Sequence, residues 1–195
     1  MTFNELQIQL DISSGNEIEV LKQHTYKTSH GYLFVDSYNG QCYLFNEHGH
    51  LNDISKVKSI DYGVFYDCTS LESMVIPDSV KSIKNWAFGY CTSLKSIVIP
   101  DSVKSIGDDA FYSCTSLESI IIPDSVESIG KWAFERCTSL ESITIPDSVK
   151  SIGDDAFYSC TSLNEVIFKG KTIDQVKTMN DYPWGIKDIS IIKCI

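Results

Sequence analysis

Cysteine has the most reactive kind of side chain in this protein, and the chain contains seven cysteines. Five recur 23 residues apart: Cys68, Cys91, Cys114, Cys137 and Cys160. Equivalent side chains of stacked repeats point the same way from backbones about 4.8 Å apart, which is poor geometry for a disulfide. We therefore expect buried free thiols, which are best kept in a reducing cytoplasm.

Serine is also repeated, but its surroundings do not predict catalysis. The repeated region contains no histidine, no Gly-x-Ser-x-Gly turn and no glycine-rich phosphate loop ahead of a helix. The sequence therefore predicts that the protein is not an enzyme and has no catalytic residue.

Two sets of side chains raise the question of a metal. Each repeat has one aspartate at a turn (Asp78, Asp101, Asp124, Asp147), which does not supply the 6–8 oxygen ligands of calcium. The N-terminal region holds four histidines and a cysteine whose spacing matches no zinc-finger pattern: His24, His30, His48, His50 and Cys42. We expect no metal and no cofactor.

The elements that position these residues repeat with the same period. Each repeat reads Leu-x-x-Ile-x-Ile, then Pro-Asp-Ser, then Val-x-Ser-Ile, then a segment such as Asp108–Cys114. The first and third pieces predict short strands, the second a turn, and the last a helical turn with Ala110, Phe111 and Cys114 facing inward. Such a coil has three sides, and a fixed period of this length is typical of a solenoid.

The motif Ile-Pro-Asp-Ser-Val-x-Ser-Ile-Gly-x-x-Ala-Phe-x-x-Cys-x-Ser-Leu resembles the BspA-type leucine-rich repeats of bacterial and trichomonad surface proteins. The resemblance covers about residues 54–168, and the segment from Phe168 to Ile186 looks like the terminal unit of bacterial and phage members. It implies a curved β-solenoid that binds proteins or host ligands. The family has no active-site residues to transfer.

We predict an α/β repeat fold, a leucine-rich-repeat β-solenoid with short strands and short helical turns, in three parts. Residues 1–52 form a β-rich N-terminal cap, with a strand near 6–12 and a hairpin of 32–35 and 42–45 about Asn39-Gly40. Residues 53–168 form five coils, starting at isoleucines 60, 83, 106, 129 and 152, plus a degenerate half coil. Residues 169–195 form a C-terminal cap with a capping box at Thr172 and Gln175, a helix to about 179 and a strand near 189–192.

The strand side is one candidate binding surface, because its outward positions should stack into rows. One row is mostly aliphatic and consists of Val75, Val98, Ile121, Thr144 and Ile167. A second includes Glu118 and Glu141. Contiguous exposed apolar surface often marks a binding site, although β-branched residues also simply suit a sheet.

The helical-turn side is a second candidate, because its residues alternate over two repeats. Trp86 and Trp132 alternate with Asp109 and Asp155, and Tyr112 and Tyr158 follow the same double period. Tryptophan and tyrosine are enriched at protein interfaces, so this side predicts a protein or sugar contact. The alternative is that each indole packs over its neighbouring coil.

The formal net charge of −10 favours a protein partner, possibly with a basic surface, over nucleic acid or an anionic membrane. We predict a non-enzymatic protein-binding module, with self-association also open. One alternative is an acidic phage or mobile-element inhibitor that blocks a basic, nucleic-acid-binding site of a host enzyme. Another is a surface adhesin or carbohydrate binder. No signal peptide is visible, which predicts a cytoplasmic protein, or an extracellular one if a leader has been removed.

Overall fold

A computed structural model describes the backbone of residues 25–28, 31–35 and 42–45, and the backbone and side chains of residues 58–195 except 70. The strand predicted near 6–12 and the Asn39-Gly40 turn lie outside these residues. Three N-terminal strands, β1 (Thr25–Thr28), β2 (Gly31–Val35) and β3 (Cys42–Phe45), form an antiparallel sheet. Val35 pairs with Cys42, which confirms the two predicted hairpin strands.

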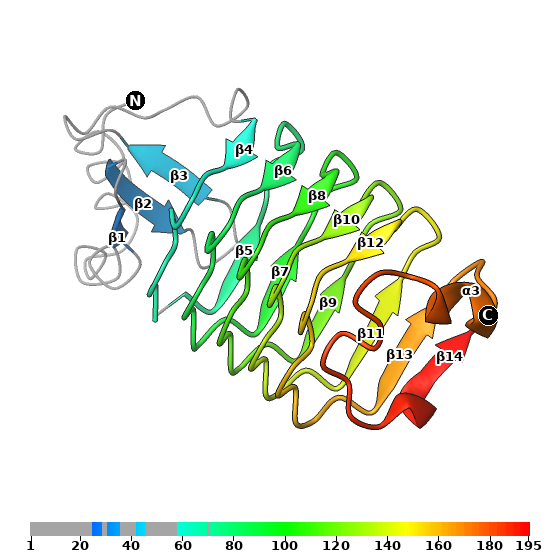
Figure 1. Ribbon diagram of the computed structural model, residues 1–195. Helices are drawn as coiled ribbons and strands as arrows, with labels where there is room; N and C mark the ends of the chain where they lie inside the picture. The colour runs from blue at the N-terminus through cyan, green and yellow to red at the C-terminus, as the bar shows by residue number, and fades with distance from the viewer. Residues whose placement is uncertain (1–24, 29–30, 36–41, 46–57, 70) are drawn as a thin grey trace.

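From residue 58 the chain forms a parallel β-solenoid, in which each coil contributes one strand to each of two sides (Figure 1). We call one side the strand face; its strands are β5 (Ser73–Val75), β7 (Ser96–Val98), β9 (Ser119–Ile121), β11 (Ser142–Ile145), β13 (Glu165–Phe168) and β14 (Ile192–Cys194). The other is a sheet of two-residue strands, β4 (Ser59–Ile60), β6 (Ser82–Ile83), β8 (Ser105–Ile106), β10 (Ser128–Ile129) and β12 (Ser151–Ile152). Each of the five isoleucines at which we predict a coil to start is the last residue of one of these short strands.

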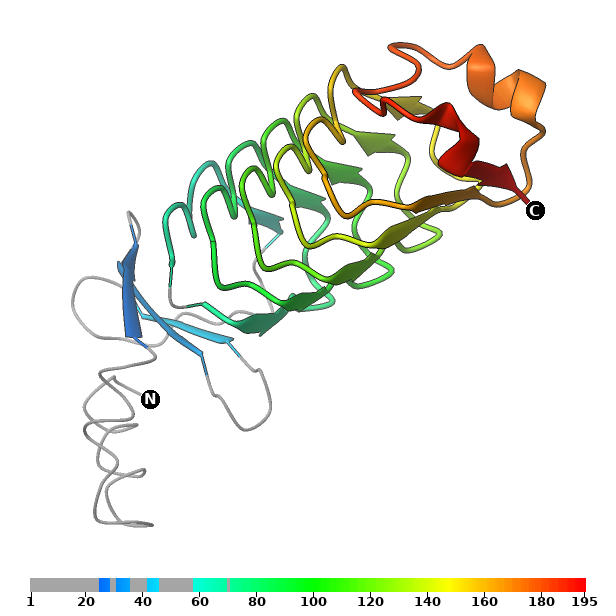
Figure 2. The same ribbon diagram turned by 90° about the horizontal axis from the view of Figure 1, so that it is seen from below.

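Equivalent residues of successive coils pair in register along the whole short-strand sheet, whereas the strand face consists of two paired groups in the described residues, β5 with β7 and β9 with β11, β13 and β14. Ser119 pairs with Ser142 on the strand face, and Ser105 pairs with Ser128 on the short-strand sheet. The register follows from the constant repeat length, because each crossover returns the chain to the same place one strand spacing further on. Figure 2 shows the coils following one another along the stack.

The third side, which we call the turn face, comprises residues 61–69, 84–92, 107–115, 130–138 and 153–161. Here the helical-turn prediction is wrong. The amide of Tyr112 donates to the carbonyl of Asp109, three residues back, whereas the next amide, of Ser113, donates to Glu135 in the following coil. Asp109 and Ser113 also have positive φ values of 54° and 55°, which an α-helix does not allow. The segment is a run of turns held by bonds between coils.

The inward placement of Ala110, Phe111 and Cys114 is confirmed, because all three are fully buried. The thiols form a regular row: Cys114 Sγ donates to the Phe88 carbonyl at 3.2 Å, and Cys137 Sγ to that of Phe111 at 3.2 Å. The repeated cysteines are free, as predicted. A single hydrophobic core runs through all the coils.

The Pro-Asp-Ser turn forms as predicted, and its serine bonds to the preceding coil. The Val103 amide donates to the Pro100 carbonyl at 3.1 Å and closes the turn. The Ser102 hydroxyl does not cap a local amide; it donates to the Val80 carbonyl of the preceding coil at 2.5 Å. This serine therefore joins coils.

Glycine follows the short strand because neighbouring coils come very close there. A Cβ built on Gly130 would lie 2.5 Å from the backbone nitrogen of Asp108. Gly107 and Gly153 face the backbone of the coil before them in the same way. A larger residue at these positions would push two coils apart.

The C-terminal segment covers part of the last coil. Helix α3 (Ile173–Lys177) has the predicted capping box, in which Thr172 and Gln175 each accept a backbone amide of the other. The predicted strand near 189–192 is displaced, because Asp188 caps a 3-10 helix, η2 (Ile189–Ile191), and β14 follows. Trp184 is fully buried against Phe168.

Candidate interaction surface

The predicted aliphatic row on the strand face is exposed along its first three members. Val75, Val98 and Ile121 have exposed fractions of 42%, 56% and 80%. Thr144 and Ile167, the last two members, are half-buried. In a strand, alternate side chains point to opposite faces, so Ile120 and Ile122 fill the core while Ile121 faces solvent. The apolar surface is therefore centred on Val98 and Ile121.

A row of charged side chains runs beside the aliphatic row. Lys95 Nζ lies 3.0 Å from a carboxylate oxygen of Glu72, and Lys193 Nζ lies 2.5 Å from one of Glu165. Both pairs are exposed at least in part, so solvent screens them and each contributes little to stability. The first pair neutralises the charge at the start of the row, whereas Glu165 lies one position away in register with Ser142, and Asn164 ends the row.

The predicted residues Glu118 and Glu141 occupy the middle of this row. Both are exposed, and the Glu141 amide donates to the Glu118 carbonyl at 3.4 Å, so the two residues sit on adjacent coils. Within the described part of the chain, neither carboxylate has a cation within ion-pair distance. The strand face therefore combines an aliphatic centre with two adjacent negative charges.

On the turn face the two predicted tryptophans have different surroundings. The indole of Trp86 contacts the rings of Tyr66, Tyr90 and Tyr112, with centroids 5.8, 6.3 and 5.2 Å away. This indole is half-buried, so the packing interpretation holds for it. Trp132 is 39% exposed and touches no other ring in the described chain. The structure does not bring the two indoles together.

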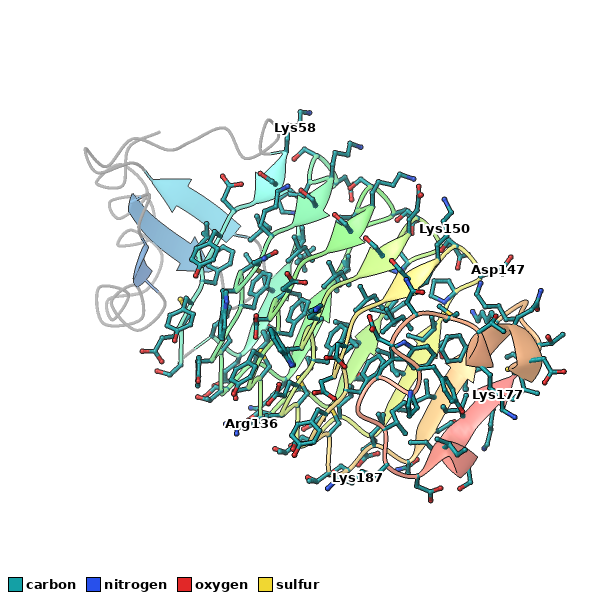
Figure 3. All side chains as sticks on the ribbon, viewed as in Figure 1. Lys58, Arg136, Asp147, Lys150, Lys177 and Lys187 are labelled. Carbon is teal, nitrogen blue, oxygen red and sulfur yellow. The ribbon has the colours of Figure 1, made fainter. Side chains whose placement is uncertain are left out.

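The residue four positions after each tryptophan explains the difference. Tyr90 stacks on Trp86 with an angle of 8° between the rings, whereas the equivalent residue after Trp132 is Arg136. The Arg136 guanidinium lies over the ring of Tyr112, 5.7 Å from its centroid. Tyr158 is 40% exposed beneath the Lys187 ammonium, 6.0 Å from the ring centroid. Figure 3 shows Arg136 and Lys187 along one edge of the molecule, with Lys58 and Lys150 near the opposite edge.

The two predicted aspartates of the turn face are also unlike each other. Asp109 is buried, and burial, followed by the charges of Asp108 and Glu135, raises the pKa of its carboxyl to about 6. Asp155, two coils further on, is half-buried. Both have positive φ, which aspartate tolerates better than most residues. Asp109 is too enclosed to be a direct contact for a partner.

The thiols are not arranged for chemistry. Burial raises the pKa of the Cys68 thiol to about 11 and that of Cys160 to about 12, and it raises the pKa of Cys114 further. A reactive cysteine needs a lowered pKa, so these thiols are poor nucleophiles. In the described residues, no three histidine, cysteine or acidic side chains are grouped to hold a metal ion. None of the helices described in this structure has the length and hydrophobicity needed to cross a bilayer.

Sequence reasoning missed a cleft of about 230 Å³ between the last coil and the C-terminal segment. Its walls include Cys160, Leu163 and Ile191. Equivalent cysteines and leucines in earlier coils are buried by the next coil, whereas Cys160 and Leu163 are half-buried because no further coil follows them. Only a comparison of the last repeat with the segment that replaces its successor could have revealed this cleft.

A family model described as "BspA type Leucine rich repeat region" matches residues 58–182 in 6 copies. No curated protein matches the chain.

Solved structures give the same picture. A leucine rich repeat protein of T. pallidum has 32% sequence identity and a TM-score of 0.60, over 71% of this chain and 62% of that one. One from Bacteroides ovatus has 34% identity and a TM-score of 0.52, over 58% and 37% of the two chains. A leucine rich cell surface protein of Faecalibacterium prausnitzii has 28% identity and a TM-score of 0.61, over 76% and 42%. The chain thus spans less than two thirds of each of these proteins.

Proposed function

This chain belongs to the BspA-type leucine-rich repeat family, and on that premise we propose that it binds a protein partner through its strand face. Repeats of this family are generally non-catalytic binding modules. The observation that carries the proposal is the exposed aliphatic row, whose centre is Ile121 with 80% of its surface accessible. Binding of a partner over an apolar patch of this kind is favourable because it removes apolar surface from water.

Rigidity supports this choice of face. Strand β7 pairs with β5 and strand β9 with β11, a backbone bond from Glu118 to Lys95 joins the two coils, and the inward side chains of these strands, such as Ile97 and Ile120, are almost fully buried. The outward side chains are thus held in place before any partner arrives. A preorganised surface loses little conformational entropy on binding.

The test compares aspartate substitutions at exposed aliphatic residues on and off the strand face. Full-length wild type, Ile121→Asp and Ile173→Asp serve as baits for proteins from cells of the source organism. Ile173 is the matched control: it is 39% exposed, and it begins α3, where an acidic residue suits the helix N-terminus.

We expect a partner that wild type and Ile173→Asp retain and that Ile121→Asp loses. The free energies of unfolding of the three proteins should agree within about 1 kcal/mol, because the substituted positions are exposed. Equal retention by Ile121→Asp, with the array intact by circular dichroism, would exclude the strand face.

A further inference from the structure

We infer that the partner of the strand face presents an aliphatic side chain next to a lysine or arginine. This inference rests on the proposed function and specifies the chemistry of the partner. It follows from how charge and apolar surface are distributed over the same two coils.

The first step is the charge. Of the four glutamates along the strand face, the outer two, Glu72 and Glu165, are paired with Lys95 and Lys193. The inner two, Glu118 and Glu141, form no ion pair in the described structure, and Lys95, which stands next to Glu118 in the row, is paired with Glu72. They lie on adjacent coils, where strands are about 4.8 Å apart and like charges repel. One cation placed between them would interact favourably with both.

The second step is the apolar surface beside these carboxylates. Ile121 follows Glu118 by three residues on the same coil, roughly 10 Å along an extended chain. Val98, on the preceding coil, is the next most exposed member of the row at 56%. An aliphatic side chain over this pair would remove the largest apolar area of the face from water.

The third step is the nature of the cation. Two carboxylates offer too few oxygen atoms for a calcium ion, which takes 6–8. A lysine or arginine needs only one or two acceptors, and its aliphatic stem can lie along the apolar row while its charge reaches the glutamates. A peptide with a basic residue two or four positions from an aliphatic one has both groups on the same side when extended.

The other charged surfaces do not match this chemistry as well. On the turn face, Asp108 Oδ1 already accepts the Lys131 amide at 2.8 Å. On the short-strand side, Glu127 lies 2.6 Å from Lys150. The strand face is where unpaired carboxylates and exposed aliphatic side chains coincide.

The experiment selects peptides from a random display library on the full-length wild-type protein. The enriched peptide is then synthesised, and its affinity is measured by calorimetry at about 50 mM and about 500 mM NaCl. The proteins compared are wild type, Ile121→Asp, the double variant Glu118→Gln/Glu141→Gln, and the control Asp101→Asn/Glu127→Gln. The control makes the same change in net charge away from the strand face.

We expect enriched peptides that combine aliphatic residues with lysine or arginine. The double variant should bind about tenfold more weakly at low salt and lose most of its salt dependence, while the control should match wild type. Ile121→Asp should abolish binding. Circular dichroism of each variant checks that the solenoid is intact.

The strand face as the binding surface and the basic character of the partner are overturned by different results. Loss of binding in Ile121→Asp, with no effect of the glutamate variant or of salt, overturns the basic partner and leaves the strand face as the binding surface. Enriched peptides that Ile121→Asp binds as well as wild type overturn both ideas. If the enriched peptides lack basic residues, or if no peptide is enriched, the inference is overturned.

Discussion

The ring of Phe111 lies parallel to that of Phe88 in the preceding coil, with 5.2 Å between centroids and 1° between planes. The next rings, of Phe134 and Phe157, continue the stack at 5.3 and 5.8 Å. This buried column runs along the solenoid, so an inner ring such as that of Phe111 is shared by two coil interfaces.

Phe111→Ala should therefore destabilise the protein by about 3–5 kcal/mol, because the cavity opens on both sides of the ring. Phe111→Leu should cost less, since it keeps more of the buried volume. Urea unfolding monitored by circular dichroism measures both values. Similar values for Ala and Leu would show that the column is not closely packed.

Gly130→Ala should destabilise the protein by about 1–3 kcal/mol through overpacking. The new methyl group would meet the backbone of Asp108 and Gly107, which cannot rotate away as a side chain could. The control is Lys131→Ala, an exposed neighbour, which should stay within about 0.5 kcal/mol of wild type. Thermal unfolding compares the three proteins. An unchanged melting temperature for Gly130→Ala would contradict the close approach of the coils.

The buried thiols should react with a disulfide reagent only after unfolding. The test uses a variant in which Cys42, Cys160 and Cys194 are serine, so that the four buried repeated cysteines remain. At pH 8 their native reaction should be on the order of a thousandfold slower than in urea, because burial raises their pKa values and blocks access. Rapid labelling of the folded protein would show that the coils open readily.

Asp109→Asn should stabilise the protein at neutral pH. The pKa of Asp109 is raised to about 6 in the folded state, so between pH about 4 and 6 the folded protein holds a proton that the unfolded chain has released. The contribution of this group to stability therefore falls as pH rises through that interval. The variant lacks this loss, and we expect a gain on the order of 1 kcal/mol at pH 7 after solvent screening is allowed for.

Asp155→Asn is the control for this change, since it occupies the equivalent turn position with a half-buried side chain. Urea unfolding at pH 4, 5, 6 and 7 gives the comparison, with the pH values chosen to span the interval of about 4 to 6. A stability difference between wild type and Asp109→Asn that does not change with pH would contradict the raised pKa.

Trp86→Ala should lower the free energy of unfolding by about 1–3 kcal/mol more than Trp132→Ala does. Both residues have positive φ near 60° and 54°, so the backbone effect of alanine is similar in the two variants. Only Trp86 loses contacts with three tyrosine rings, which contribute beyond simple burial. Equal losses in chemical denaturation would show that the aromatic cluster adds nothing.

Much of the fold could be predicted because it repeats. The inward positions of Phe111, Cys114 and Leu117, and the outward position of Ile121, follow from the period and from strand alternation. The turn face was predicted less well, since its conformation depends on residues with positive φ that no hydrophobic pattern marks.

Differences between coils were the least predictable features of the candidate surfaces. Trp86 and Trp132 occupy equivalent positions, and their exposure differs because Tyr90 in one coil is replaced by Arg136 in the other. The burial of Asp109 and the cleft beside Leu163 likewise depend on what one particular neighbour supplies. Periodicity describes what coils share, so it cannot predict these contrasts.

The bonds between coils also determine how the molecule would respond to mechanical force. On all three sides they are directed along the stack, as between Ser105 and Ser128 or Phe111 and Ala133. A pull applied to the two ends would therefore load one coil at a time and peel it from its neighbour. Each rupture would release one repeat, which lengthens the chain by roughly 70–80 Å, so a force-extension trace should show evenly spaced steps of that size.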